Sequence, residues 1–119
     1  MEKKKILIVD DDETNINFVR RILEEYGYQF ITADNGLDGF IVWENKKDEI
    51  NLIITDLNMP WMNGKELIQK IRDSGSEVKI ILMSGDYTEE RALKNGADAF
   101  VSKLYLFEHL KDKVTALLT

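Results

Sequence analysis

The sequence has no cysteine and only one histidine, His109, and both facts narrow the chemistry open to it. Without thiols there can be neither a disulfide framework nor a zinc site built from thiolates. Because small secreted domains commonly depend on disulfides, an intracellular protein is the simpler interpretation. We expect His109, between Phe107 and Leu110 in a final helix, to be an ordinary surface residue.

Long apolar runs and an excess of positive charge are also missing. The lysines at positions 3–5 precede only four strongly apolar residues, whereas a signal peptide core needs about 7 to 15 and a membrane span about 20. The formal net charge is -6, and both nucleic acids and anionic membranes attract a basic face. We therefore expect a soluble, cytoplasmic protein that binds neither nucleic acid nor membrane directly.

The 119 residues with 44% apolar content fit one compact domain, residues 1–119, around a single core. Short continuous apolar runs alternate five times with stretches whose apolar residues recur every three or four positions. Unbroken apolar runs are typical of parallel strands that are covered on both faces. The predicted strands are residues 6–9, 30–33, 52–55, 78–83 and 99–101.

Five helices are predicted between and after these strands. Gly27 can end the first helix in a left-handed conformation, and Asn95 and Gly96 close the short fourth helix. The apolar residues that mark the helix faces are, in chain order, Ile16, Val19, Ile22, Leu23 and Tyr26, then Leu37, Phe40 and Ile41, then Leu67, Ile68 and Ile71, then Ala92 and Leu93, and finally Phe107, Leu110, Val114 and Leu117.

Five such strand-helix units are too few for a closed barrel, which needs eight units and roughly 250 residues. The predicted fold class is therefore α/β, an open doubly wound sandwich with a parallel five-stranded sheet of order 2-1-3-4-5 and helices on both faces. Such sheets bind ligands beyond the carboxyl ends of the strands, where the winding direction reverses. That point lies between the first and third predicted strands.

Acidic residues follow both of these strands directly. Asp10 and Asp11 come after the first strand, and Asp56 comes after the third, so three carboxylates converge if the strands are neighbours. Such a cluster repels itself unless a hard divalent cation such as Mg²⁺ neutralises it, and the cation then makes one aspartate a usable acceptor for phosphate. Asp12 and Glu13 fit better as a helix N-terminal pair, because negative charge there favours the helix dipole.

Two further polar residues follow strands at the same edge, Ser84 after the fourth and Lys103 after the fifth. The motifs around these positions are Ile-Leu-Ile-Val-Asp-Asp, Ile-Thr-Asp-Leu-Asn-Met-Pro-Trp-Met-Asn-Gly, Met-Ser-Gly and Ala-Phe-Val-Ser-Lys, in that order. With this ordered set, essentially the whole chain resembles the receiver domain of two-component response regulators, the chemotaxis-regulator-like domains with a flavodoxin-like fold.

The resemblance implies that Asp56 accepts a phosphoryl group from the phosphohistidine of a histidine kinase or of a phosphotransfer protein in a phosphorelay. It also implies a Mg²⁺ ion that is bound directly by Asp11 and Asp56, through a water by Asp10, and by the backbone carbonyl of Asn58. Lys103 would pair with Asp56 first and with a phosphoryl oxygen afterwards.

A switch is implied as well. The Ser84 hydroxyl would move towards the phosphoryl group, and the loop after the fourth strand would rearrange. Phe100, the aromatic residue on the fifth strand, would rotate into the space that this loop vacates. Phosphorylation would thus shift the population between two arrangements of the surface formed by helix 4, strand 5 and helix 5, which binds an unknown downstream protein. Phe100 has no hydroxyl, so no switching hydrogen bond is expected there. We expect a monomer or a weak dimer.

The sequence departs from the family pattern in two places. Leu104 stands where relatives usually have a proline joined by a cis bond; because a cis bond before another residue costs about 2.5–4 kcal/mol, we predict a trans bond, with Lys103 still reaching Asp56. Asp86 adds a carboxylate near the mouth of the pocket, which predicts weak reactivity with small phosphodonors. Trp61 is predicted to be exposed and could contact a kinase.

Three other functions compete with this interpretation. A haloacid-dehalogenase-type phosphatase also uses a Mg²⁺-bound aspartate, but Asn58 stands where such enzymes usually have a general acid. A flavodoxin-like flavin carrier has the same fold, but the acidic loop after the first strand would repel its phosphate. A receiver-like interaction module that is not regulated by phosphorylation is kept open by Leu104. We predict a signalling domain with only self-phosphorylation and self-dephosphorylation chemistry, not an enzyme; whether it stands alone, shuttles phosphate or is part of a longer protein stays open.

Overall fold

Five parallel strands form one sheet in the order β2-β1-β3-β4-β5, as the sequence predicts. The computed structural model describes residues 3–119. The strands are β1 (Lys5–Val9), β2 (Gln29–Ala33), β3 (Leu52–Asp56), β4 (Lys79–Ser84) and β5 (Ala99–Ser102). The helices are α1 (Glu13–Leu23), α2 (Gly36–Lys46), α3 (Gly64–Asp73), α4 (Glu89–Lys94) and α5 (Leu106–Leu118), with short 3-10 turns at Glu24–Tyr26 and Lys103–Tyr105.

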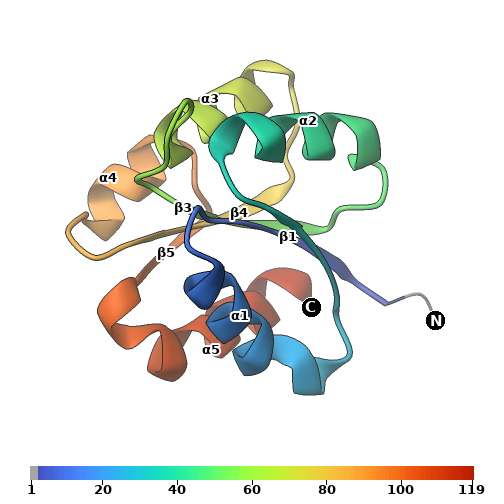
Figure 1. The fold of residues 1–119 in the computed structure, drawn as a ribbon, viewed down its shortest axis with the longest axis vertical. Helices are drawn as coiled ribbons and strands as arrows, with labels where there is room; N and C mark the ends of the chain where they lie inside the picture. The colour runs from blue at the N-terminus through green and yellow to red at the C-terminus, as the bar shows by residue number, and fades with distance from the viewer. Residues whose placement is uncertain (1–2) are drawn as a thin grey trace.

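Helices cover both faces of the sheet (Figure 1). Residues Ile6 and Ile8 of β1 pack into a core with α1 and α5, whereas Leu7 and Val9 pack into a second core with α2, α3 and α4. This alternation explains the unbroken apolar runs in the sequence, because each strand needs apolar side chains for both of its faces. No helix in the described part of the chain combines the length and the apolar character that a membrane span requires.

The predicted buried face of α2 is wrong in part. Leu37 and Ile41 are exposed, and the buried residues of α2 are Gly36, which lies against the Met62 backbone, together with Gly39 and Trp43. A Cβ atom on Gly39 would lie only 2.9 Å from a methyl carbon of Val9, so α2 approaches β1 too closely for a larger side chain. Counting large apolar residues therefore misses a face that is formed by glycines.

Three other large side chains that were predicted on buried helix faces are exposed instead. Phe107 is 69% exposed, because α5 buries Leu106, Leu110 and Val114, which recur every four residues, and Phe107 lies one position outside that series. Leu93 on α4 and Tyr26 after α1 are also exposed. Phe107, Leu93 and Tyr26 thus belong to the surface and contribute little to the core.

Asn95 and Gly96 follow the end of α4 as predicted, whereas α1 ends at Leu23 and a 3-10 turn, Glu24–Tyr26, separates it from Gly27. Gly27 has a φ of 77° and ends the turn after α1, and Gly96 has a φ of 103° after α4. Helix α3 is capped at its amino end by Asn63, whose side chain accepts from the Glu66 backbone N–H while the Glu66 side chain accepts from the Asn63 backbone N–H. This reciprocal cap fixes where α3 starts after the loop that leaves β3.

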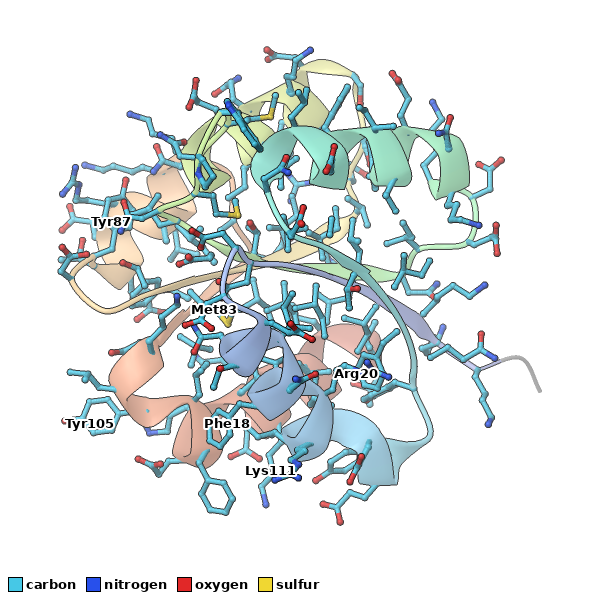
Figure 2. The ribbon with its side chains drawn as sticks, in the orientation of Figure 1. Phe18, Arg20, Met83, Tyr87, Tyr105 and Lys111 are labelled. Atoms are coloured by element: carbon cyan, nitrogen blue, oxygen red, sulfur yellow. The ribbon has the colours of Figure 1, made fainter. Side chains whose placement is uncertain are left out.

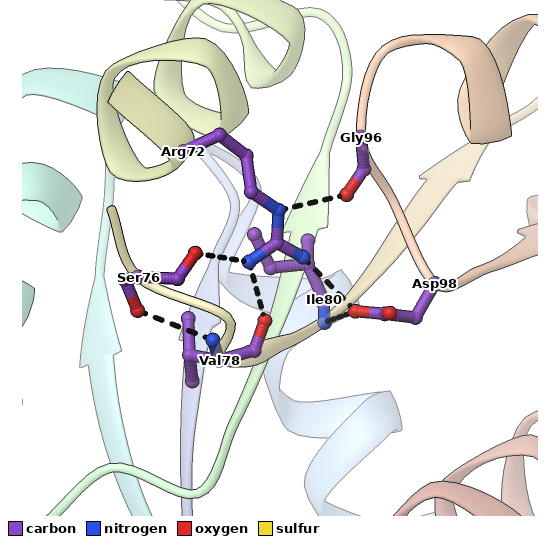
Figure 3. Close-up of polar contacts among 6 residues, drawn as sticks. All are labelled: Arg72, Ser76, Val78, Ile80, Gly96 and Asp98. Atoms are coloured by element: carbon purple, nitrogen blue, oxygen red, sulfur yellow. Dashed lines mark hydrogen bonds and ion pairs between the residues drawn. The ribbon is translucent and has the colours of Figure 1, made fainter. Parts of the chain in front are cut away.

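An arginine ties together three segments at the amino end of β4 and β5 (Figure 3). Arg72 of α3 donates to the carbonyls of Gly96, Ser76 and Val78 at 2.7–3.1 Å, and it pairs with the Asp98 carboxylate at 3.0 Å. The same Asp98 oxygen accepts from the Ile80 backbone at 2.8 Å. This group, the Arg72 cluster, holds the end of α3, the start of β4 and the loop before β5 in one arrangement.

Candidate functional site

The pairing of β1 with β3 brings the acidic residues together at the opposite, carboxyl edge of the sheet. Val9 is in register with Thr55, so the next residues along each strand are Asp10 and Asp56. Carboxylate oxygens of Asp10, Asp11 and Asp56 lie within 4.8 Å of one another. Asp10 is fully buried and Asp56 is 4% exposed, whereas Asp11 faces solvent. We call these three residues the acidic cluster.

Lys103 brings a positive charge to the acidic cluster. Its Nζ lies 2.9 Å from Oδ1 of Asp56 and 3.5 Å from Oδ2 of Asp10. No peptide bond among residues 3–119 is cis, so the Lys103–Leu104 bond is trans and the lysine still reaches Asp56, as predicted. The long, flexible lysine side chain makes this possible without a proline after it.

Hydrogen bonds leave the acidic cluster incompletely satisfied. Oδ1 of Asp56 accepts from the Leu57 backbone at 2.8 Å, and Oδ1 of Asp10 accepts from the Asp12 backbone at 2.9 Å. Oδ2 of Asp10 is buried and has no hydrogen-bond partner among residues 3–119. The Lys103 ammonium, 3.5 Å away, forms only a long ion pair with it. A buried oxygen of this kind is costly unless something else binds it.

Burial also disfavours the ionised form of these acids. It raises the pKa of Asp10 from its ordinary 3.8 to about 6, although the hydrogen bond from the Asp12 backbone opposes the rise. Burial raises the pKa of Asp56 too, against the hydrogen bond and the charge of Lys103. Burial alone would lower the pKa of Lys103, but its bond to Asp56 and the nearby carboxylates raise it overall.

This arrangement fits a small, hard divalent cation. When all three acids of the cluster are ionised, they face the single ammonium of Lys103 and leave two negative charges uncompensated. Carboxylate oxygens at the edge of a sheet are ligands that Mg²⁺ accepts, usually together with several waters. The unpartnered Oδ2 of Asp10 is a further acceptor for a cation or for one of its waters. The donor set therefore suits Mg²⁺ better than zinc, which prefers nitrogen and sulfur.

The other predicted site residues lie at the end of β4, on β5 and in the loop after β3. Ser84 ends β4 beside β3, is 1% exposed, and donates its hydroxyl to Oδ1 of Asp86 at 3.0 Å. Phe100 lies half-buried on β5 and packs against the core under α3 and α4. Asn58 is exposed two residues after Asp56, and its role as a carbonyl ligand stays a prediction.

Two features near the site were not predicted from the sequence, one hydrogen bond and one backbone conformation. The bond between Ser84 and Asp86 was not predicted, although a serine two positions before an aspartate is a spacing typical of local turns. Trp61 is exposed, as predicted, at 81%, and it also has a φ of 66°. That backbone conformation is rare for a bulky residue and was not visible in the sequence.

Comparisons with known proteins agree with this geometry. A family model described as "Response regulator receiver domain" matches residues 6–115. The "Probable transcriptional regulatory protein SilR" of Salmonella typhimurium is 33% identical over 117 residues, which are 96% of this chain and 50% of that protein. The "Sensor histidine kinase RcsC" of Escherichia coli K12 is 34% identical over 113 residues, 92% of this chain and 12% of that protein.

Solved structures show the same fold. A response regulator receiver domain protein (CheY-like) from Methanospirillum hungatei superposes with a TM-score of 0.84 at 31% identity, covering 98% of this chain and 94% of that one. A receiver domain of the Francisella response regulator 1452 gives a TM-score of 0.89 at 25% identity, covering 98% and 97%. The chain spans half or less of the curated relatives named above, but nearly all of these structures.

Proposed function

The chain belongs to the response regulator receiver family of two-component signalling, and on that basis we propose that Asp56 is its phosphoacceptor and that it works with Mg²⁺. The observation that carries the proposal is the geometry around Asp56: two other carboxylates within 4.8 Å and the Lys103 ammonium at 2.9 Å. Residues 1–119 would form one receiver domain, active in the cytoplasm as a signalling component and not as an enzyme with a separate substrate.

The chemistry is a displacement at phosphorus. The hydrogen bond from the Leu57 backbone and the ion pair with Lys103 both end on Oδ1 of Asp56, so we infer that Oδ2 is the attacking oxygen. The oxygen forms a bond to phosphorus while the bond from phosphorus to the donor's histidine nitrogen breaks, and the imidazole leaves. Attacker and phosphoryl group are both anionic, so positioning and charge neutralisation supply most of the catalysis. Mg²⁺, held by Asp11, Asp56 and the Asn58 carbonyl, with Asp10 binding through a water, would supply part of that neutralisation.

Lys103 has two tasks in this proposal. Before the reaction it pairs with Asp56 and limits the repulsion among the carboxylates. After the reaction its ammonium can follow the charge onto a phosphoryl oxygen, because the flexible side chain needs only a small movement. Its raised pKa keeps the ammonium protonated throughout.

The signal would leave the site through Ser84 and Phe100. A phosphoryl oxygen near the end of β4 attracts the Ser84 hydroxyl, and Phe100 on the neighbouring β5 can follow the change in packing. Two populations of the α4-β5-α5 surface would result, and a downstream protein would bind one of them. We propose a histidine kinase or a phosphotransfer protein as the donor, with exposed Trp61 available for contact, and a monomer or weak dimer as the working state.

Asn58 argues against the phosphatase alternative. It is exposed two residues after Asp56, where a general acid would be needed, and an amide cannot protonate a leaving group. The interaction module without phosphorylation loses its main support, because Leu104 leaves the contact between Lys103 and Asp56 intact. We therefore keep the phosphoacceptor as the proposal and the module as the outcome of a failed test.

Intact-mass spectrometry tests the proposal directly. The protein is incubated with Mg²⁺ and phosphoramidate or acetyl phosphate, and native chain is compared with Asp56→Asn and with Asp48→Asn, which changes an exposed carboxylate on a distant loop. We expect one phosphoryl group on native chain and on Asp48→Asn, and none on Asp56→Asn. An equal mass increase on Asp56→Asn would refute the assigned acceptor, and no increase with any donor, including a phosphorylated phosphotransfer protein, would favour the interaction module.

A further inference from the structure

The hydroxyl of Ser84 is already engaged before any phosphoryl group arrives. It donates to Oδ1 of Asp86 at 3.0 Å, and it accepts from the Asp86 backbone N–H at 3.3 Å. Within residues 3–119, these are the hydrogen bonds that the hydroxyl makes. Ser84 is 1% exposed whereas Asp86 is exposed to solvent, so the buried hydroxyl is hydrogen-bonded to a carboxylate on the surface.

We propose that Asp86 is a latch that holds Ser84 in the unphosphorylated arrangement and that phosphorylation must displace. This inference rests on the function proposed for Asp56 and adds a regulatory residue to the same site. A serine hydroxyl has one proton, so it cannot donate to Asp86 and to a phosphoryl oxygen at once. Asp86 therefore competes with the phosphoryl group for Ser84.

The sheet register places this competition beside the acceptor. Asp56 of β3 pairs with Met83 of β4, so Ser84 is the next residue at the same edge. Neighbouring strands lie about 4.8 Å apart, within the range that a phosphoryl group on Asp56 can span. The new dianion would also repel the Asp86 carboxylate and help to open the latch.

Opening the latch would move a segment that is tied to α4. Tyr87, the next residue, accepts a hydrogen bond from Asn95 at 2.5 Å, and the Arg91 guanidinium lies 4.4 Å from the centre of its ring. Figure 2 shows Tyr87 beside α4, on the other side of the sheet from Phe18 and Tyr105. A shift of Asp86 would thus reach α4 through Tyr87, and the proposed binding surface includes α4.

An ordinary turn is the competing explanation. Ser-Gly-Asp is a common loop sequence, and a bond between its side chains can simply stabilise the loop. The two explanations predict different effects of removing this bond on the affinity for a phosphoryl group. Losing a mere turn bond would leave the affinity for a phosphoryl group unchanged, whereas losing a latch would raise it, because the unphosphorylated arrangement alone is stabilised by the bond.

The test measures how tightly the protein binds beryllofluoride, a mimic of the phosphoryl group, in the presence of Mg²⁺. The variants are Asp86→Ala, which removes the acceptor, and Asp86→Asn, which keeps an acceptor without charge. Both are made in native chain and in Ser84→Ala, and Glu89→Gln serves as a control for the loss of a nearby negative charge. We expect Asp86→Ala to bind about three- to tenfold more tightly than native, with Asp86→Asn between them.

The Ser84→Ala background decides the mechanism. We expect the gain from Asp86→Ala to fall there to the small effect of Glu89→Gln, since no hydroxyl is left to release. An equal gain in both backgrounds would overturn the latch and leave only a charge effect. No gain from Asp86→Ala in native chain would overturn it as well.

A second measurement does not depend on phosphoryl binding. Three-bond NMR couplings of the Ser84 methylene protons should report one side-chain rotamer in native protein and an average of several in Asp86→Ala, with Glu89→Gln like native. Identical couplings in native and Asp86→Ala would contradict the latch. If native protein fails to bind beryllofluoride at all, the function proposed for Asp56 falls and the latch falls with it. If native protein binds beryllofluoride but Asp86→Ala changes neither the affinity nor the Ser84 couplings, only the latch is refuted.

Discussion

The two edges of the sheet hold polar clusters of opposite character. At the amino edge, Arg72 donates to three carbonyls and pairs with Asp98, so the charged groups have partners of good geometry (Figure 3). At the carboxyl edge, the acidic cluster gathers three carboxylates around one lysine, and a buried oxygen of Asp10 lacks a hydrogen-bond partner among residues 3–119. The same fold thus supports one satisfied cluster and one that is not.

From this difference we infer that the Arg72 cluster stabilises the fold, which agrees with the chemistry proposed for the acidic cluster. A satisfied polar network fixes one arrangement and lowers the free energy of the fold. A cluster of crowded, buried acids raises that free energy, and such sites persist where a ligand or a reaction uses them. We therefore expect substitutions at the two edges to change stability in opposite directions.

Arg72→Ala should have the largest effect. It leaves the carboxylate of Asp98 and three carbonyls without their donor, so we expect the free energy of unfolding to fall by about 2–4 kcal/mol. Urea unfolding followed by circular dichroism measures this. Arg72→Lys keeps the charge but lacks the planar fork, and it should lose about half as much. A loss below about 0.5 kcal/mol for Arg72→Ala would show that the Arg72 cluster does not hold the fold.

Asp10→Asn should act in the opposite direction. The amide keeps an acceptor for the Asp12 backbone but removes the buried charge, whose cost is reflected in the pKa of about 6. We expect the free energy of unfolding at pH 7 in EDTA to rise by about 1–3 kcal/mol, since each factor of ten in proton affinity corresponds to about 1.4 kcal/mol. Asp48→Asn, at an exposed position, should change it little. A loss of stability for Asp10→Asn would break the comparison between the two edges.

The pH dependence isolates the same group. Because the pKa of Asp10 is raised in the fold, its penalty is fully present above about pH 6 and disappears as pH falls towards 3.8. In EDTA, the stability gap between Asp10→Asn and native protein should therefore narrow by about 1–2 kcal/mol between pH 7 and pH 5. Unfolding curves at both pH values measure this gap, and a gap that widens in acid would contradict the assignment.

Trp61→Gly should have the smallest effect. Trp61 is 81% exposed and has a φ of 66°, which glycine adopts without strain. We expect a gain of about 0.5–1 kcal/mol in the free energy of unfolding and a weaker interaction with a phosphotransfer protein. Trp61→Asn serves as a second variant, because asparagine also tolerates this conformation. An unchanged interaction would show that the strain at Trp61 does not serve partner binding.

The strands could be predicted from local signals, and their order from the general rules for doubly wound sheets. Continuous apolar runs identify the strands, and residues directly after the strands must meet at one edge once the order is known. Asp10, Asp56 and Lys103 were found in this way, and the trans bond before Leu104 followed from the cost of the cis form.

Features that depend on close approach between elements were not predictable. Gly39 lets α2 lie against β1 and turns Leu37 and Ile41 outward, which a count of large apolar residues cannot show. The bonds of Arg72 join residues up to 26 positions apart, and no local pattern encodes them. The contact between Ser84 and Asp86 is local, but a loop spacing does not reveal which way the hydroxyl points.

Calorimetric titration of Mg²⁺ at pH 7 tests the central claim most directly, namely that the crowded acids at the carboxyl edge form a cation site. We predict one ion per chain for native protein and for Arg72→Lys, no measurable binding for Asp56→Asn, and weaker binding to native protein at pH 5, where Asp10 is protonated. Native protein that binds no Mg²⁺ at pH 7, or that binds it equally well after Asp56→Asn, would contradict the account.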